Sequence, residues 1–254
     1  MIAIINQKGG VGKTTTAINL AHALALSGQQ VLAVDLDPQG HLGLGLGISD
    51  KSTPGMDEVL LNGENLGDFI VHTRHDSNHS GLDIVPAGPG LVNVEHVNEG
   101  GMERGLRLKN ALSSYQEKYD SVIFDCPPSS GLLGMNALFA ADELVIPVSS
   151  DFLALQSLSS LMETLAFVEQ AKNCTIRKHV VMTRFQQRRR LAREVRESLL
   201  LHFPDQLMET SIRENVALAE SPSYGETIFE YNAVSNGAVD YRQMANELTQ
   251  SRWH

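Results

Sequence analysis

The chain has 254 residues, 42% of them hydrophobic, which is enough for one sizeable core, and its formal net charge of −10 argues against nucleic-acid binding by the protein as a whole. No run of residues approaches the ~20 apolar residues of a membrane span, and a glycine-rich motif starts close to Met1, so we expect neither a membrane span nor a signal peptide. Two isolated cysteines, Cys126 and Cys174, form neither a disulfide framework nor a CxxC metal spacing, so we expect a reducing, cytoplasmic environment.

The first predicted elements form a strand–helix–strand unit. Ile2–Ile5 is a short apolar run that ends in a glycine-rich loop. Thr15–Ser27 has the apolar spacing of a helix, which we expect to end at Gly28. Gln30–Leu36 (QVLAVDL) is a second apolar run of strand length. A crossover of this kind implies that the two strands are parallel.

The loop between the first strand and the first helix reads KGGVGKTT, which is the end of a phosphate-binding loop. Small residues let backbone N–H groups surround phosphate oxygens, and the start of the helix adds positive potential. Lys13 can reach the β- and γ-phosphates, and the Thr14 hydroxyl can bind Mg²⁺. The usual first glycine is replaced by Gln7 or Lys8, and the alternative is a plain glycine turn before a helix. The residues expected at the nucleotide are Lys8, Gly9, Gly10, Val11, Gly12, Lys13, Thr14 and Thr15.

Two acids follow each other at the end of the second strand, in the sequence VDLDPQG. Strand alternation places Asp35 and Asp37 on the same side. Carboxylates at the carboxyl end of a strand, beside a phosphate loop, are placed for Mg²⁺ or water rather than for packing. The alternative for Asp37 is a helix N-cap.

Another acid ends a later buried strand, in SVIFDCPPS. Asp125 is suited to hold a Mg²⁺-bound water or the Thr14 hydroxyl, and Pro127 stiffens the loop that follows. The alternative for Asp125 is an acid that caps a turn. The sequence does not explain Ser49–Gly101, apart from a short strand at Leu82–Pro86.

The remaining elements continue the alternation of apolar strands and helices, which is typical of a parallel sheet covered on both faces. We therefore predict a single α/β domain over residues 1–254, a P-loop NTPase with a mostly parallel twisted sheet and helices on both faces. The further predicted strands are Ser121–Asp125, Glu143–Pro147 and His179–Thr183, and the further helices are Leu106–Tyr115, Leu153–Gln170, Leu191–His202 and Tyr241–Gln250.

Positive charge is concentrated in one segment, Arg177–Arg196. Eight Lys/Arg and one acid give this window a net charge of +7, which leaves −17 for the rest of the chain. Such a cluster can contact DNA phosphates without reading base sequence. A solvated face or a contact with an acidic partner protein is the alternative. The candidate DNA-binding residues are Arg184, Arg188, Arg189, Arg190, Arg193 and Arg196.

The sequence KGGVGKTTT resembles the deviant Walker A motif of the ParA/MinD family, whose mark is a second lysine, here Lys8. The resemblance implies an ATP/ADP- and Mg²⁺-binding homodimer, in which Lys8 crosses to the nucleotide of the partner. It makes Lys8, Lys13 and Asp37 the catalytic set, with Asp37 positioning the attacking water. Thr14, Asp35 and Asp125 would then serve Mg²⁺, partly through water.

The C-terminal third is also similar to the family. SIRENVALAESPSYGETI resembles the ParA pattern IPRNVxLxEAPSxGxPI, although Arg213 and Glu214 stand where the family usually has Pro and Arg. The match extends to Ser235–Ala238 and Tyr241, so it covers essentially the whole chain. The resemblance implies that the adenine site is formed by Thr183, Arg184, Ile212, Arg213 and Glu214.

The resemblance implies a switch in which ATP closes a dimer, the dimer binds nonspecific nucleoid DNA, and an adaptor protein triggers hydrolysis. Such a protein would position or partition a cargo. One alternative is a MinD-like membrane ATPase, for which the segment Asp240–His254 is weakly suited because Arg242 and Arg252 are its only basic residues apart from His254. Another is a metabolic P-loop enzyme.

Overall fold

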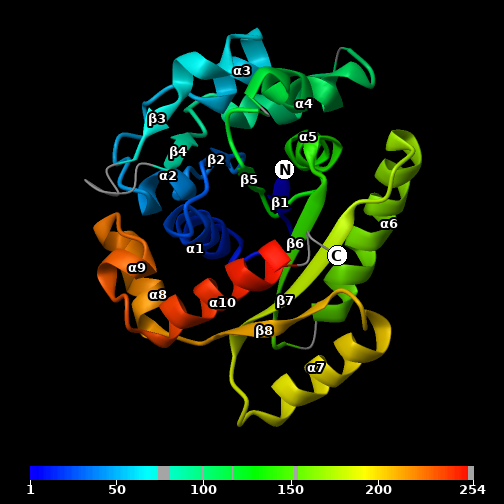
Figure 1. The fold of residues 1–254 in the computed structure, drawn as a ribbon. Helices are drawn as coiled ribbons and strands as arrows, with labels where there is room; N and C mark the ends of the chain where they lie inside the picture. The colour runs from blue at the N-terminus through cyan, green and yellow to red at the C-terminus, as the bar shows by residue number, and fades with distance from the viewer. Residues whose placement is uncertain (74–80, 99, 116, 152–153, 251–254) are drawn as a thin grey trace.

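The described residues form a sheet of eight strands in the order β3-β4-β2-β5-β1-β6-β7-β8 (Figure 1). The computed structural model describes residues 1–73, 81–98, 100–115, 117–151 and 154–250. Neighbouring strands pair in parallel, except that β3 runs antiparallel to β4. The strands are β1 (Ile2–Ile4), β2 (Val31–Asp35), β3 (Val71–His72), β4 (Leu82–Val85), β5 (Ser121–Asp125), β6 (Glu143–Ser149), β7 (Arg177–Phe185) and β8 (Leu207–Arg213).

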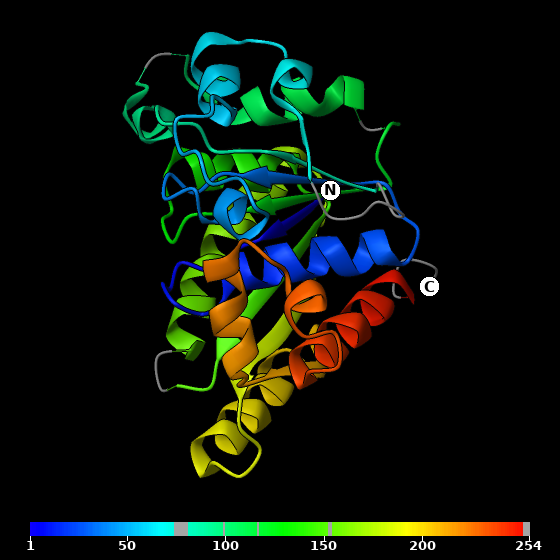
Figure 2. The same ribbon diagram turned by 90° about the vertical axis from the view of Figure 1, so that its left-hand side faces the viewer.

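Helices cover both faces of this sheet (Figure 2). Alternating residues of β1 enter two different cores: Ile2 and Ile4 pack with α1 and α10, whereas Ala3 lies in the core that contains α5 and α6. The predicted α/β fold with a mostly parallel sheet is therefore confirmed. The α-helices are α1 (Lys13–Leu26), α2 (His41–Gly45), α3 (Met56–Asn62), α4 (Arg107–Leu112), α5 (Leu132–Ala140), α6 (Ala154–Lys172), α7 (Arg190–His202), α8 (Val216–Glu220), α9 (Ile228–Tyr231) and α10 (Asn236–Gln250).

Several elements differ from the sequence-based expectation. Helix α5 was not predicted, because its nine residues are nearly all apolar and show no helical stripe. Strand β8 was not predicted either, because its seven residues include Glu209, Thr210 and Ser211 on an edge that is only partly buried. Leu153, the predicted first residue of the helix that corresponds to α6, and Arg252 near the C-terminus lie outside the described residues. None of the described helices combines the length and the apolar character that crossing a bilayer requires.

The segment that the sequence left unexplained contains α3, β3 and the 3₁₀ turns Leu66–Phe69 and Leu91–His96 within its described part. Its most specific contact is made by Glu95, whose carboxylate accepts the N–H groups of Leu132 at 2.6 Å and Leu133 at 3.3 Å. A Cβ on Gly131 would come within 2.1 Å of that carboxylate. Glu95 therefore caps the start of α5 and supports the loop that follows Asp125.

Strand β8 is the last strand of the sheet, and α10 packs along it (Figure 1). Glu247 of α10 accepts the N–H groups of Glu209 at 2.7 Å and Thr210 at 3.0 Å. Asp240 of the same helix accepts the N–H of Arg213 at 2.9 Å. Two carboxylates of α10 thus bind three backbone donors of this edge strand.

Candidate functional site

The central strands bring the predicted phosphate loop and acids to one edge of the sheet. The register pairs Ile4 of β1 with Asp125 of β5, and Asp125 with Asp35 of β2. The carboxyl ends of these three neighbouring strands therefore lie together, and the loop after β1 begins beside both carboxylates. This is the usual position of a ligand site in a parallel α/β sheet.

The phosphate loop has the backbone that its glycines allow. Gly10 and Gly12 are left-handed, with φ of 74° and 88°, a conformation that a side chain would strain. Gly12 is the N-cap of α1, so the free N–H groups of that helix open into the loop. Lys13 is buried, and its ammonium donates to the Lys8 carbonyl oxygen at 3.3 Å. Burial lowers the pKa of Lys13, against the opposing charge of Asp125.

Asp125 is fully buried, and within the described residues neither carboxylate oxygen accepts a hydrogen bond. Burial, and next the charge of Asp35, raise the pKa of Asp125 well above its usual value, whereas the nearby Thr14 hydroxyl and the charge of Lys13 act in the opposite direction. Burying an ionised carboxylate without partners costs free energy, unless a bound cation or water molecule interacts with it. Asp125 and Thr14 therefore fit a Mg²⁺ site.

Asp35 has a different environment. Its carboxylate accepts the N–H groups of Asp37 at 3.1 Å, Leu42 at 3.1 Å and Gly43 at 3.3 Å. Burial raises the pKa of Asp35 to about 7, although these three donors favour the charged form. Asp35 thus holds the start of α2 and the loop that carries Asp37, which favours the supporting role predicted for it.

Asp37 is partly exposed, and its side chain accepts the N–H of Gln39 at 3.0 Å. It lies two residues beyond the end of β2, at the same edge of the sheet as Asp125. A partly exposed carboxylate beside the phosphate loop can bind a water molecule, as the role predicted for Asp37 requires. Within the described residues no group of three or more His, Cys, Asp or Glu side chains could by itself hold a metal ion.

Lys8 is bound within its own chain in this structure. Its ammonium forms an ion pair with Asp151, which follows β6 and whose other oxygen accepts the Ser149 hydroxyl at 2.6 Å. The Lys8 N–H also donates to the Asn6 side chain at 2.9 Å. No sequence pattern predicted Asp151 as a partner of Lys8, because 143 residues separate the two. Lys8 would have to leave Asp151 in order to reach a second molecule.

A cavity of about 670 Å³ opens beside the phosphate loop, and it collects the residues predicted for the adenine site. Thr183 connects the cavity wall to the phosphate loop, because its hydroxyl donates to the Val11 carbonyl at 2.8 Å. Arg184 is held in a left-handed conformation, with φ of 50°. The sequence-based prediction omitted Tyr241, whose hydroxyl is 3.2 Å from that of Thr16. The wall of this cavity includes Gly12, Thr15, Thr183, Arg184, Ile212, Arg213, Glu214, Asn215 and Tyr241.

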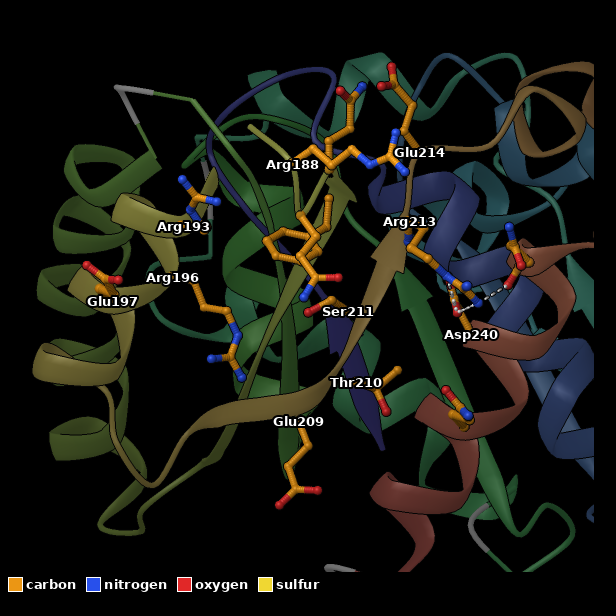
Figure 3. A pocket seen from close by; sticks show the side chains of 15 residues that line it. Arg188, Arg193, Arg196, Glu197, Glu209, Thr210, Ser211, Arg213, Glu214 and Asp240 are labelled. Atoms are coloured by element: carbon orange, nitrogen blue, oxygen red, sulfur yellow. Dashed lines mark hydrogen bonds and ion pairs between the residues drawn. The ribbon is translucent and has the colours of Figure 1, made fainter. Parts of the chain in front are cut away.

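Three of the six predicted DNA-binding arginines line one groove. Arg188, Arg193 and Arg196 line a groove of about 1320 Å³ between α7 and α10, with β8 below (Figure 3). Within the described residues no ion pair or hydrogen bond engages their guanidinium groups. Arg190 is instead paired with Glu194 at 2.7 Å, and Arg184 lies at the other cavity. We define the three groove residues Arg188, Arg193 and Arg196 as the arginine groove.

Comparisons with known proteins agree with this geometry. The model of the AAA domain family matches residues 1–178. The chromosome partitioning protein ParA of Myxococcus xanthus is 42% identical over 252 residues, which cover 98% of this chain and 87% of that protein. The sporulation initiation inhibitor protein Soj of Bacillus subtilis is 40% identical over 250 residues, covering 98% of this chain and 97% of that protein.

Among solved structures, cobyrinic acid a,c-diamide synthase from Mycobacterium smegmatis with bound ADP and magnesium is 30% identical, with a TM-score of 0.82. The match covers 98% of this chain and 93% of that one. The fold is therefore shared beyond partitioning proteins, whereas the nearly full-length identities of 40–42% are to ParA and Soj. The chain belongs to the ParA/Soj family of chromosome-partitioning ATPases.

Proposed function

We propose that this ATPase is a Mg²⁺-dependent switch that dimerises around ATP, binds nonspecific DNA of the nucleoid in that state, and positions or partitions a cargo when an adaptor protein stimulates hydrolysis. The observation that carries the proposal is the arginine groove. Three guanidinium groups without a partner among the described residues lie in one groove of an otherwise acidic protein. That groove shares Arg213 and Glu214 with the cavity beside the phosphate loop. A DNA site next to a nucleotide site is the arrangement that an ATP-controlled DNA switch requires.

Each part of the nucleotide has a candidate binding region at this edge of the sheet. The amides of residues 9–14 and Lys13 would bind the phosphates, and the 670 Å³ cavity would hold adenine and ribose. Thr14 and Asp125 would hold Mg²⁺, partly through water, with Asp35 as support. Bound Mg²⁺ supplies positive charge that offsets the charge on the phosphates, and it would favour the ionised form of Asp125. Pro127, buried in the loop after Asp125, would shape the site near the γ-phosphate.

The dimer part depends on Lys8. A cation that arrives from the partner stabilises charge on the transferring phosphate and closes the site to water. In Lys8→Ala we expect ATP binding close to wild type, because Lys13 and the loop amides remain, together with loss of the ATP-dependent dimer. Calorimetry measures binding, and light scattering coupled to size exclusion measures the dimer. A variant that still hydrolyses ATP at the full adaptor-stimulated rate would refute the composite site.

The DNA part predicts the effect of reversing charge in the arginine groove. Arg188→Glu/Arg193→Glu/Arg196→Glu should lose ATP-dependent DNA binding and keep its basal ATPase rate, because these side chains do not line the cavity beside the phosphate loop. Each phosphate contact contributes about −0.9 to the slope of log affinity against log salt. Six groove arginines in a dimer therefore predict a slope that flattens by up to about 5. Fluorescence anisotropy with two unrelated duplexes at several salt concentrations measures it.

Arg190→Glu is the matched control. Arg190 is exposed at the start of α7, the helix that carries Arg193 and Arg196, but it is already paired with Glu194 and does not line the groove. We expect its substitution to weaken DNA binding much less than the triple change. Equal losses would show that the DNA site is the helix surface rather than the groove. If wild type trapped with ATP ignores DNA and sediments with anionic vesicles, a membrane-binding switch replaces this proposal.

A further inference from the structure

The cavity beside the phosphate loop and the arginine groove meet at the end of β8, where Arg213 lines both. Arg213 stands at a position where the ParA pattern has proline. Proline would fix the backbone at that point, because its ring restricts φ. This chain lacks that restraint, so another contact has to hold the edge of the cavity formed by residues 212–214.

Asp240 of α10 makes that contact (Figure 3). Its carboxylate is only 3% exposed, and it accepts the backbone N–H of Arg213 at 2.9 Å. The same carboxylate accepts Nε of Arg213 at 3.0 Å and a terminal guanidinium nitrogen at 2.5 Å. The hydrogen bond to Asp240 raises the pKa of Arg213. One buried group therefore fixes both the backbone and the side chain of Arg213 by charge-assisted hydrogen bonds.

The next residue of α10 also lines the cavity. Tyr241 is buried, lines the cavity, and places its hydroxyl 3.2 Å from that of Thr16 in α1. Helix α1 begins at the phosphate loop. Consecutive residues of α10 thus hold the end of β8 and the helix that follows the phosphate loop, so the width of the cavity depends on where α10 lies.

We propose that Asp240 is a positioning residue for the nucleotide base: through Arg213 it sets the 212–214 edge against which the base is bound. The proposal rests on the assignment of the 670 Å³ cavity to adenine and ribose. It also means that the Arg213 guanidinium is held by α10 rather than directed at the base. The side chain at this position therefore contributes geometry to nucleotide recognition, and the backbone makes the contacts.

The test compares a ligand that has a base with one that does not. Asp240→Asn is titrated by calorimetry with Mg²⁺–ATP and with Mg²⁺–tripolyphosphate, which needs only the phosphate loop. We expect ATP to bind about 10-fold more weakly, the cost of one misplaced charge-assisted hydrogen bond. Tripolyphosphate should bind as it does to wild type. Arg213→Gln replaces a side chain that is 45% exposed. It should show the same selective loss, and it serves as the test if Asp240→Asn does not fold.

Glu247→Gln is the matched control, because Glu247 also joins α10 to backbone N–H groups of β8 but lies away from the cavity. We expect it to lower thermal stability and leave both affinities unchanged. The proposal is overturned if Asp240→Asn weakens ATP and tripolyphosphate equally, or weakens neither, or if Glu247→Gln reproduces its effect on ATP. If wild type binds ATP no better than tripolyphosphate, the base assignment fails and the proposal fails with it.

Discussion

Lys13→Ala is expected to abolish nucleotide binding. Lys13 is buried at the start of α1. Among the described residues its ammonium donates only to the Lys8 carbonyl oxygen, at 3.3 Å, so it is available for phosphate. Lys8 carries the other ammonium of the loop, and this group is paired with Asp151. Losing charge-assisted contacts to two phosphates should weaken ATP binding at least about 100-fold. Titration calorimetry with Mg²⁺–ATP measures the loss.

Lys172→Ala is a suitable control for the removal of a partly buried lysine. Its ammonium donates to carbonyl oxygens of Leu138 and Ala141, far in the fold from the phosphate loop, and burial lowers its pKa as it does for Lys13. This variant should bind ATP normally even if it melts at a lower temperature. Wild-type ATP affinity in Lys13→Ala would contradict the assignment of the phosphate loop.

Asp37→Ala is expected to stop turnover while the protein still binds ATP and dimerises. Asp37 is the partly exposed acid of the site, whereas Asp35 and Asp125 are buried beneath it. Removing a water-positioning carboxylate typically lowers the rate by ~10²–10⁴-fold. The variant should accumulate as an ATP-bound dimer that remains bound to DNA. Single-turnover hydrolysis and size exclusion with ATP measure the two effects.

Asp50→Ala provides the comparison for Asp37→Ala. Asp50 is an exposed acid of the segment that follows α2, and its carboxylate accepts only from Ser52 among the described residues. The Asp50→Ala variant should hydrolyse ATP at the wild-type rate. An Asp37→Ala protein that stays monomeric with ATP would show that Asp37 serves closure of the dimer rather than the water.

The sequence was sufficient to predict the centre of the fold, and local spacing identified the candidate phosphate loop and its acids. Continuous apolar strands predicted β1, β2, β5 and β6, since buried parallel strands carry this pattern on both faces. The loop after β1 and the acids Asp35 and Asp125 were predicted from local spacing, and the register of the sheet then brought them together.

What the sequence could not show were contacts between distant segments. Lys8 with Asp151, Glu95 with the start of α5, and Arg213 with Asp240 join residues 143, 37 and 27 positions apart. No periodicity or motif links such pairs. Charge counting likewise grouped six arginines, and it could not show that Arg188, Arg193 and Arg196 line one groove while Arg190 pairs with Glu194.

The carboxylates that α10 places along β8 have a consequence for how this protein behaves when crowded. A terminal strand with free N–H groups is a template on which a second chain can add a strand, which leads to aggregation. Glu247 and Asp240 occupy the donors of Glu209, Thr210 and Arg213, and both bring negative charge to that edge. We expect this arrangement to disfavour strand addition between copies of the protein that bind side by side on one DNA molecule. Any association there would then have to use other surfaces.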